Sequence, residues 1–333
     1  MLATLTVSTC ARPTDSTREV FRDKTVRIVV AFAAGGGYDL HARVMAESFG
    51  RHLSGSPAVV VENMAGAGGL VAANYLARQA PADGLTIGML GPGAVIPQLL
   101  DRAGVQYDIR QFGIIGAPTT ETSNVCVTPQ SSGIDLESWR TRKTTVRVAT
   151  LGRGSAPHVH AAFMAAALKL PAHFVNGYKG TSEIRLAMDG GEVDVLCTGL
   201  TSYRTTIEPM GHYKVIVQSE DDAELTRAGV PSAARLVQDE HGRALLAVLV
   251  GLRALDRFYV VPPGTPAATL QMLREAFAAT MADPQFLSAA KAARLEIRPM
   301  RGDETAAKVA AILNMPDAAR QIVIDLLSAE ELH

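Results

Sequence analysis

Short apolar runs alternate with segments of helical spacing over most of this chain. Arg27 to Phe32 is a β-branched and aromatic run, which indicates a buried strand, whereas apolar residues recur at helical spacing from Tyr38 to Phe49. Between them lies Ala33 to Gly37, a turn with three glycines. A strand that enters a helix through such a turn is the basic unit of an α/β fold.

The same unit recurs further along the chain. Ala58–Glu62 predicts a second strand, followed by the glycine-rich turn Asn63–Gly69 and a helix over Leu70–Gln79. Leu85–Leu90 predicts a third strand, which ends at Gly91–Gly93. The repetition predicts an α/β fold with a mostly parallel sheet, in which ligands bind beyond the carboxyl ends of the strands. All three glycine clusters fall at such ends.

A second block of the same kind begins near Asn124. Its predicted strands are Asn124–Thr128, Val146–Thr150, His173–Asn176, Val193–Cys197 and Lys214–Gln218. Its predicted helices are Leu136–Arg140, Pro157–Leu168 and Ser182–Met188. After an apolar run at 244–252, the strand Arg257–Val261 ends at two prolines, and spacing from Pro266 to Leu332 is helical. Two α/β blocks and a helical C-terminal region predict two lobes with a cleft between them.

Composition and charge narrow the function classes. The chain has 333 residues, of which 47% are hydrophobic, and this is enough for two cores. The formal net charge of -1 and the lack of a Lys/Arg-rich run argue against nucleic acid as a partner. No apolar run approaches the roughly 20 residues that a bilayer span needs, so we expect a soluble mature protein.

The N-terminal segment and the cysteines leave alternatives open. Residues 1–24 predict an export or linker segment that is poorly ordered, although Met1–Thr9 lacks a basic start. The residues before Cys10 resemble a lipoprotein cleavage site, so Cys10 is either a lipid anchor or an incidental cysteine. Cys126 and Cys197 are either a disulfide in an oxidising compartment or two buried thiols.

The first glycine turn is a candidate anion site. Backbone N–H groups at Gly36 and Gly37 are not shielded by a Cβ and lie at the positive end of a helix, so they can accept a carboxylate. The plainer interpretation is that the glycines only permit a tight turn. Asp39 is expected to fix the turn, because a carboxylate there would repel an anion, and Arg43 follows at the spacing that neutralises it.

The sequence gives little support for a dinucleotide-binding, hydrolase or metal site. Gly66 and Gly68 imitate a dinucleotide fingerprint, but Val71 occupies the third glycine position. Ser155 lacks the G-x-S-x-G elbow of a hydrolase, and His158 and His160 lie two residues apart without further metal-ligating residues. We therefore expect no cofactor, no metal and no catalytic residues.

Four segments carry a resemblance to a known family. VRIVVAFAAGGGYDLHAR, VVVENMAGAGGLVAANYLA, GYKGTSEIRLAMDGGEVDV and PPGTPAATLQMLREAFAATMADPQF resemble the extracytoplasmic solute receptors of tripartite tricarboxylate transporters, the Bug-type receptors. The resemblance covers about Lys24 to Leu327. It implies a two-lobed type II periplasmic-binding fold, with one lobe formed by 25–123 plus 245–333 and the other by 124–244.

The resemblance also implies a binding site for a small carboxylate. The ligand-binding residues that it implies are Gly35, Gly36, Gly37, Tyr38, Asp39, Gly66, Gly68, Gly69, Gly154, Ser155, Tyr178, Lys179 and Gly180. Tyr38 replaces a small residue that is common in the family, and Asn176-Gly177 replaces a usual Val-Pro. The Tyr38 and Tyr178 hydroxyls can bond the ligand or a bridging water, and Lys179 is either a ligand cation or a solvated turn residue.

Two functions follow as alternatives. The favoured one is a monomeric periplasmic or extracytoplasmic receptor that delivers a small organic acid to membrane permease subunits. The second is an α/β enzyme that acts on a small carboxylate with Lys179 or Asp39. The glycine turns lack a nucleophile with a base and an orienting group, which favours the receptor.

Overall fold

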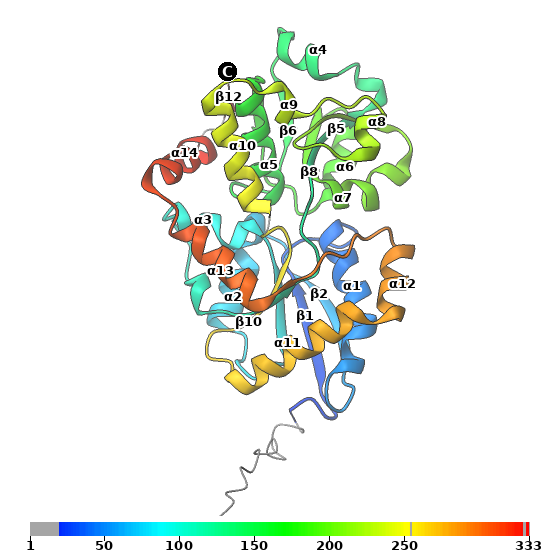
Figure 1. Cartoon of the computed structure of the whole chain (residues 1–333), viewed down its shortest axis with the longest axis vertical. Helices are drawn as coiled ribbons and strands as arrows, with labels where there is room; N and C mark the ends of the chain where they lie inside the picture. The colour runs from blue at the N-terminus through cyan, green and yellow to red at the C-terminus, as the bar shows by residue number, and fades with distance from the viewer. Residues whose placement is uncertain (1–19, 254, 329–330, 333) are drawn as a thin grey trace, which may run out of the picture.

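The computed structural model describes residues 20–253, 255–328 and 331–332, which form two lobes (Figure 1). Most of the predicted segment 1–24, Cys10 included, lies outside the described residues. Each lobe is built on one mixed sheet flanked by helices, so the predicted two-lobed α/β fold is confirmed. Among the described residues, no helix combines the length and apolar character that a bilayer span requires.

The first sheet has the strand order β11-β4-β10-β3-β1-β2. Its strands are β1 (Thr25–Val30), β2 (Ala58–Asn63), β3 (Thr86–Leu90), β4 (Gly113–Ala117), β10 (Phe258–Val261) and β11 (Met300–Arg301). β1 pairs in parallel with β2 and β3, with Ile28 opposite both Val61 and Ile87, whereas β10 lies antiparallel between β3 and β4. The helices of this lobe are α1 (Gly37–Phe49), α2 (Leu70–Arg78), α3 (Ile96–Leu99), α11 (Ala267–Ala282), α12 (Pro284–Ala292) and α13 (Gly302–Leu313).

The second sheet has the order β12-β7-β6-β8-β5-β9. Its strands are β5 (Asn124–Pro129), β6 (Val146–Ala149), β7 (Ala172–Val175), β8 (Val195–Gly199), β9 (Tyr213–Gln218) and β12 (Glu331–Leu332). The helices of this lobe are α4 (Leu136–Thr141), α5 (Ala156–Leu168), α6 (Thr181–Asp189), α7 (Leu200–Thr206), α8 (Ala223–Arg227), α9 (Ala233–Leu236), α10 (Glu240–Arg253) and α14 (Asp317–Ser328). Short 3₁₀ turns are η2 (Gly50–His52), η3 (Ala67–Gly69), η4 (Pro92–Ala94), η5 (Ile109–Gln111), η6 (Gln130–Ser132) and η7 (Glu208–Met210).

The direction of the strands follows from how the chain crosses between the lobes. β1, β2, β3 and β4 run the same way, and so do β6, β7, β8 and β9. Four described strands run the other way: β5, β10 and the short edge strands β11 and β12. Of these, β5 and β10 are the two that the chain enters directly from the opposite lobe. The carboxyl ends of the parallel strands therefore face the space between the lobes.

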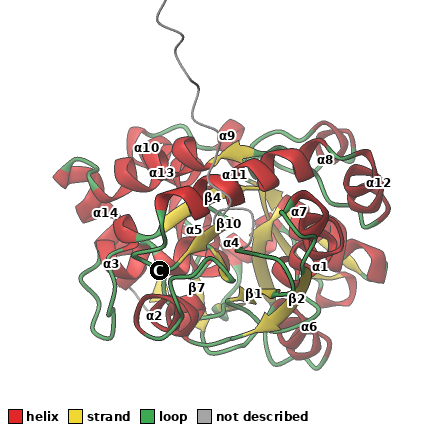
Figure 2. Cartoon of the chain, turned by 90° about the horizontal axis from the view of Figure 1, so that it is seen from below, coloured by secondary structure: helices red, strands yellow, loops and turns green. Residues whose placement is uncertain are grey.

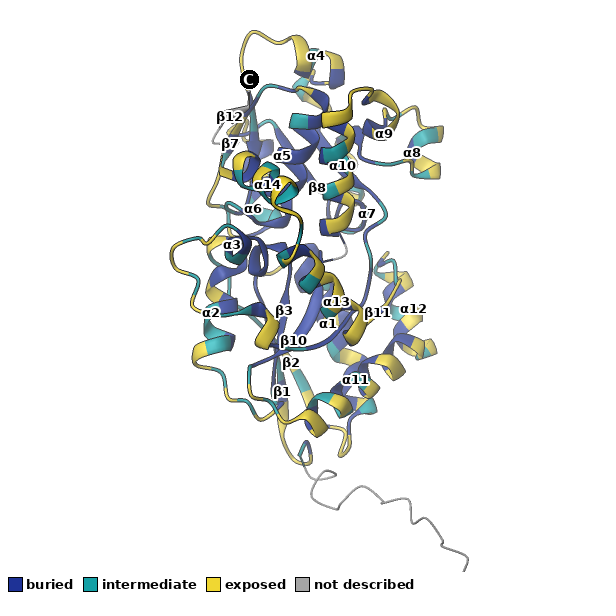
Figure 3. Cartoon of the chain, turned by 60° about the vertical axis from the view of Figure 1, so that its left-hand side comes forward, coloured by how far each residue is buried: buried dark blue, intermediate teal, exposed yellow. Residues whose placement is uncertain are grey.

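Apolar patterning explains how the helices pack. α5 is apolar on all sides and almost wholly buried, because it lies between the second sheet, α10 and α14. α1 buries Ala42, Met45 and Phe49 and exposes Arg43 and Glu47. Helices surround the strands in the view from below (Figure 2). The inner strands β3, β5, β8 and β10 are buried, whereas the edge strand β2 and the outer faces of α11 and α12 are partly exposed (Figure 3).

The lobe boundaries differ from the predicted division at two places. The predicted boundary at 244/245 falls inside α10, which packs along α5 in the second lobe until Arg253. The C-terminal region also returns to that lobe: α14 packs on α5, and β12 pairs with β7. The assignment of 245–333 to the first lobe thus fits only the part from β10 to α13, because the buried face of α14 (Val323, Leu326 and Leu327) needs the apolar surface of the second lobe.

Cys126 and Cys197 form a disulfide, which decides between the two predicted alternatives. The two residues lie opposite each other on the antiparallel strands β5 and β8 and are fully buried. The bond joins residues 71 positions apart in sequence, so it restricts the unfolded chain strongly.

We expect the double variant Cys126→Ala/Cys197→Ala to lose about 2–4 kcal/mol of unfolding free energy, because its unfolded chain is no longer cross-linked. Urea denaturation followed by circular dichroism measures this loss. The wild-type protein in dithiothreitol is the control and should approach the variant, which itself should not respond to reductant. An unfolding midpoint equal to that of the oxidised wild type would contradict the expectation.

Candidate functional site

Turns from both lobes meet where the carboxyl ends of the two sheets face each other. The Ala33 N–H, after β1, donates a hydrogen bond of 3.0 Å to the Lys179 carbonyl oxygen, after β7. The Ser182 hydroxyl donates to the Ala34 carbonyl oxygen at 3.3 Å. These bonds join the first glycine turn, Ala33–Gly37, to the segment Lys179–Ser182 of the second lobe, so the lobes are closed on each other.

Asp39 fixes the first turn, as the sequence predicts. Its carboxylate accepts hydrogen bonds from Gly35 N at 2.9 Å, from Asn63 Nδ2 at 3.0 Å and from Arg43 Nε and Nη2 at 3.0 and 2.9 Å. Burial raises the pKa of Asp39, but the bonds from Arg43, Gly35 and Asn63 outweigh it and hold that pKa below its usual value. The Asp39 carboxylate therefore holds the turn in place and forms an ion pair with Arg43.

The close approach of the lobes leaves no room for a Cβ at Gly37 unless Ser202 moves, and little room for one at Gly36. A Cβ at Gly37 would lie 2.5 Å from the Ser202 hydroxyl of α7, and one at Gly36 would lie 3.2 Å from the Thr181 hydroxyl of α6. Gly36 precedes α1 and offers no side chain to cap it. Among the described residues, no side chain caps the start of α1, so its first amides are available to an acceptor from outside the helix.

An inner chamber lies behind this contact. It measures about 20 Å³ and is lined by Phe32, Ala33, Gly36, Gly37, Tyr38, Leu151, Ala156, Pro157, Gly180, Thr181, Thr198, Ser202 and Asp256. The Tyr38 ring contacts the Phe32 ring, with centroids 4.3 Å apart, and the Arg257 guanidinium lies 4.9 Å from its centre. Tyr38 is buried, and its side chain helps to reduce the chamber to this small volume.

An outer chamber of about 360 Å³ also lies between the lobes. Its walls are Gly66, Ala67, Arg102, Leu151, Gly152, Arg153, Asn176, Gly177, Tyr178 and Lys179. The Tyr178 hydroxyl donates to the Glu192 carboxylate at 2.7 Å, and burial together with this bond raises the pKa of Tyr178 to about 12. The volume is in the range of small-molecule sites.

The structure distributes the predicted site residues over several places. Gly36, Gly37, Tyr38 and Gly180 line the inner chamber, and Gly66, Tyr178 and Lys179 line the outer chamber. Gly35 and Asp39 face a separate groove of about 200 Å³ together with residues of α6, α7 and η7. Gly68, Gly69, Gly154 and Ser155 line neither chamber.

Gly68, Gly154 and Ser155 lie where the turns of the two lobes meet, whereas Gly69 approaches only residues of the first lobe. A Cβ at Gly68 would lie 3.1 Å from Ser155 Cβ, and the Gly154 N–H donates to His158 Nδ1 at 3.1 Å. Burial lowers the pKa of His158 to about 4, which keeps its ring neutral and able to accept this bond. The Ser155 hydroxyl is buried and has no hydrogen-bond partner among the residues that the structure describes.

A larger groove of about 440 Å³ lies on the first lobe, between α11 and the segment from Pro299 to Asp303. None of the glycine turns reaches it. The site that the strand ends build is therefore the pair of chambers between the lobes.

A family model described as the tripartite tricarboxylate transporter family receptor matches residues 41–315. The chain belongs to this receptor family. A UPF0065 protein in the tcbD-tcbE intergenic region of Pseudomonas sp. (strain P51) is 31% identical over 210 residues, which are 59% of this chain and 60% of that protein. The match thus spans less than two thirds of that relative.

Two solved structures share the fold of this receptor. The periplasmic binding protein BugD has a TM-score of 0.71 at 23% identity, covering 93% of this chain and 98% of that one. MatC from Rhodopseudomonas palustris, solved with bound malate, has a TM-score of 0.69 at 21% identity, covering 91% and 99%. The family is of the periplasmic receptor type, and the predicted resemblance is confirmed.

A buried ion cluster behind the inner chamber of the receptor does not follow from the sequence patterns. Arg257 donates from Nη1 to Glu121 Oε1 at 2.7 Å and to the Asp256 carboxylate, and from Nη2 to the Ser202 hydroxyl. The Tyr38 hydroxyl donates to the Asp256 carbonyl oxygen. Arg257, Glu121 and Asp256 are each at most 2% exposed.

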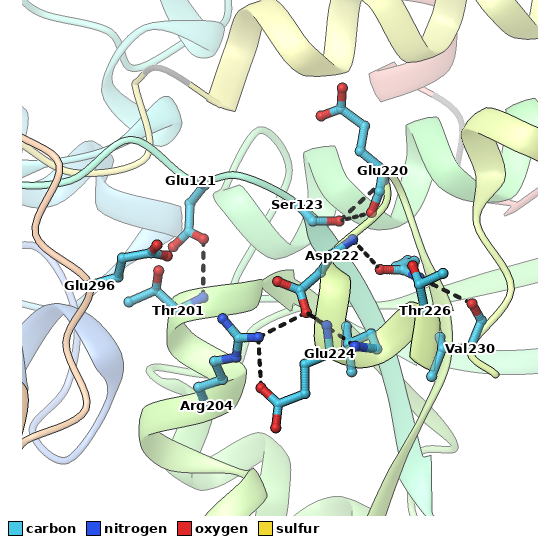
Figure 4. A network of polar contacts seen from close by, with 12 residues as sticks. Glu121, Ser123, Thr201, Arg204, Glu220, Asp222, Glu224, Thr226, Val230 and Glu296 are labelled. Carbon is cyan, nitrogen blue, oxygen red and sulfur yellow. Dashed lines mark hydrogen bonds and ion pairs between the residues drawn. The ribbon is translucent and has the colours of Figure 1, made fainter. Parts of the chain in front are cut away.

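The cluster joins both connections between the central strands of the lobes. Glu121 lies between β4 and β5, and Asp256 and Arg257 lie between α10 and β10. Glu121 also accepts a bond of 3.1 Å from the Thr201 N–H, and nearby Ser123 donates to the Glu220 carbonyl oxygen at 2.9 Å (Figure 4).

Burial and neighbouring charges shift the pKa values of Glu121 and Arg257. Burial raises the pKa of Glu121, with Arg257 opposing and Asp256 adding to the shift. Burial lowers the pKa of Arg257, but Asp256 and Glu121 outweigh it and hold that pKa above its usual value. Arg257 therefore remains charged, and its hydrogen bonds to Glu121 and Asp256 offset part of the cost of burying these two carboxyl groups.

We expect Arg257→Met to lower the unfolding free energy by about 3–5 kcal/mol, because it leaves two buried carboxyl groups without their cation. The pKa of Glu121, which burial already raises, should then rise further because the opposing cation is gone. A folded-state pKa above the unfolded one makes the variant most stable below the ordinary pKa of a glutamate, and the variant should lose stability as the pH rises above it, more steeply than the wild type. Urea denaturation at a series of pH values measures both effects.

Arg235→Met is the matched control, since Arg235 forms an exposed ion pair with Asp221 and should contribute less than about 1 kcal/mol. Equal stability of the two variants at neutral pH would show that the cluster does not depend on Arg257.

Proposed function

We propose that this protein is an extracytoplasmic receptor that captures a small organic carboxylate between its lobes and delivers it to the membrane permease of a tripartite tricarboxylate-type transporter. The observation that carries the proposal is the meeting of the two glycine turns, at the Ala33–Lys179 hydrogen bond, beside chambers lined from both lobes. Membership of the family and the malate bound to MatC support it.

The turns supply donors that suit a carboxylate held reversibly. The amides at the start of α1 lack a capping side chain, and those of Gly180 and Thr181 open α6 in the opposite lobe without one. Backbone donors at two helix N-termini attract an anion without a full positive charge. Lobes that close on the anion from both sides remove it from water.

The hydroxyls of Tyr38 and Tyr178 donate to other groups of the protein, whereas the sequence predicts that they bond the ligand or a bridging water. The Tyr38 and Tyr178 hydroxyls donate to Asp256 and Glu192, so only their oxygen lone pairs remain for a ligand or a bridging water. We therefore assign the recognition of the acid to loop amides and to the basic side chains of the outer chamber.

The enzyme alternative has no support in the family or in the neighbouring folds. We infer that the protein returns its ligand unchanged and has no catalytic residues. The enzyme alternative would use Asp39 or Lys179 as catalytic residues. In our proposal they have other roles, since Asp39 is bound to Arg43 and Lys179 lies at an exposed turn.

The compartment and the partners belong to the same proposal. The Cys126–Cys197 disulfide suits an oxidising compartment such as the periplasm. We further propose that the receptor is a monomer, that its partners are the permease subunits, and that Cys10 carries a lipid anchor.

A thermal-shift screen against di- and tricarboxylates, monocarboxylates, amino acids and aromatic acids tests the proposal. A ligand at 100-fold its dissociation constant should raise the unfolding free energy by roughly 2.7 kcal/mol, because it binds only the folded chain. We expect a carboxylate to raise the melting temperature by several degrees, and small-angle X-ray scattering should show a more compact protein.

Mass spectrometry of the denatured complex should recover that acid unchanged. It also detects an acid that co-purifies and would mask the shift. Conversion of the acid would support the enzyme instead, and a protein that neither contains nor binds any acid would overturn the proposal.

A further inference from the structure

The first turns of two helices from opposite lobes meet beside the buried ion cluster. Gly37 begins α1 in the first lobe, and Ser202 lies in the first turn of α7 in the second lobe. A Cβ at Gly37 would lie 2.5 Å from Ser202 Oγ and 3.2 Å from Arg257 Nη2. The two helices and the Arg257 guanidinium thus pack together at a point where α1 presents no side chain.

Arg257 is anchored to the first lobe. It directly precedes β10, which is an interior strand of the first sheet. The Tyr38 hydroxyl, from α1, donates to the carbonyl oxygen of Asp256, and the Tyr38 ring centre lies 4.9 Å from the Arg257 guanidinium. We therefore expect Arg257 to move with the first lobe when the lobes separate.

Ser202 is anchored to the second lobe. α7 follows β8 without a break, and the Thr201 N–H donates at 3.1 Å to Glu121, which lies just before β5 of the same sheet. The bond from Arg257 Nη2 to the Ser202 hydroxyl therefore crosses between the lobes. The bond from Arg257 Nη1 to Glu121 lies at the connections between the lobes, about which the lobes turn.

The bond between Arg257 and Ser202 favours closure. Arg257 is 1% exposed and Ser202 is 5% exposed. A hydrogen bond from a charged donor is stronger than one between neutral groups, and burial strengthens it further. Because the two partners are anchored to different lobes, this bond forms only when the lobes are closed.

We propose that Arg257 and Ser202 form a latch that favours the closed arrangement of the lobes, and that Gly37 allows α1 and α7 to come close enough for it. The latch sets the ratio of closed to open molecules, and so the affinity for a ligand that the closed lobes enclose. The inference rests on the proposed function, in which the lobes close on an acid, and adds the residues that set how readily they close.

Gly37 offers a substitution that acts on one arrangement only. It lies within a helix, where alanine is favoured over glycine, so Gly37→Ala should not destabilise α1. The added methyl group meets Ser202 Oγ only when α7 lies against α1. Gly37→Ala should therefore oppose the closed arrangement and leave the open one unaffected.

Two introduced thiols report the closed arrangement without any ligand. A Cβ at Gly36, just before α1, would lie 3.2 Å from Thr181 Oγ1 of α6 in the opposite lobe, which is close enough for a disulfide between cysteines at both positions. The test uses the full chain with Cys10→Ser, Gly36→Cys and Thr181→Cys. It is dialysed until mass spectrometry of a denatured sample detects no bound acid.

Two rates together follow the ratio of closed to open molecules. Oxidation by oxygen with copper phenanthroline joins the two thiols at a rate that rises with the closed fraction. Alkylation of the thiol at position 36 by a maleimide requires the open arrangement, because Gly36 is buried when the lobes are closed. The oxidation rate divided by the alkylation rate is therefore proportional to the ratio of closed to open molecules.

Ser202→Ala and Gly37→Ala should each lower this ratio about fivefold or more, the first because it removes the crossing bond and the second because its methyl group opposes closure. The two effects should not add, since the methyl group meets no hydroxyl in the double variant. The double variant should thus have a ratio no lower than that of Gly37→Ala.

Each variant has a matched control. Thr206→Ala removes a buried hydroxyl of the same helix, whose bond to the Ser202 carbonyl oxygen at 2.8 Å stays within α7. Gly251→Ala adds a methyl group to α10, where a Cβ would meet no other group of the described residues within 4 Å. Both controls should change the ratio less than about twofold. Circular dichroism checks the folding of every variant, and Gly37→Ala tests the latch even where Ser202→Ala folds poorly.

Two outcomes would overturn the inference. One is a ratio in both latch variants equal to that in their controls, and the other is a wild-type reporter chain whose two thiols never join. Neither outcome bears on the proposed function, which fails only if the protein neither contains nor binds any acid.

Discussion

The closed arrangement of this receptor depends on one buried cation. Arg257 holds Glu121 and Asp256, which lie on the two connections between the central strands of the lobes, and it reaches Ser202 on α7 of the second lobe. Burying three charged groups costs several kcal/mol per ion in isolation, and only complete mutual pairing offsets this. The geometry of both connections is thereby tied to one set of hydrogen bonds, and any movement of the lobes must preserve or rebuild it.

The cleft is organised around that cluster. Tyr38 lies against Arg257 on one side and against Phe32 on the other, so this wall of the inner chamber is part of the same packed unit as the connections. Further out, the larger chamber is lined by glycine turns of both lobes and by three basic residues.

Much of the fold follows from local patterns, and its exceptions have physical causes. The strand, turn and helix units are predictable because each contains an apolar run and a glycine turn within a short stretch. β4, with the sequence GIIGA, is not, since two of its five residues are glycine and its helical neighbours come from α11 and α13 far along the chain. The lobe boundary is misplaced because the apolar run at 244–252 does not reveal which α/β block it packs on.

The candidate site likewise contains residues that the sequence predicts and residues that it does not. The glycine turns and the Asp39–Arg43 pair can be predicted because their spacing carries the chemistry. Arg257 and Glu121 are 136 residues apart, and nothing near either one indicates the other. Arg153 stands inside a glycine turn and offers some signal, whereas Arg102 follows a short helix with no recognisable pattern and becomes informative only when the lobes close.

The path of the chain has a kinetic consequence. β10 occupies an interior position of the first sheet although it begins only at Phe258, and the second sheet receives β12 from the last residues. Neither lobe can complete its hydrogen-bonded sheet until most of the polypeptide is available, and such long-range pairing slows folding. A chain that folds late remains extended for longer after synthesis, which fits the export across a membrane that the proposed function requires.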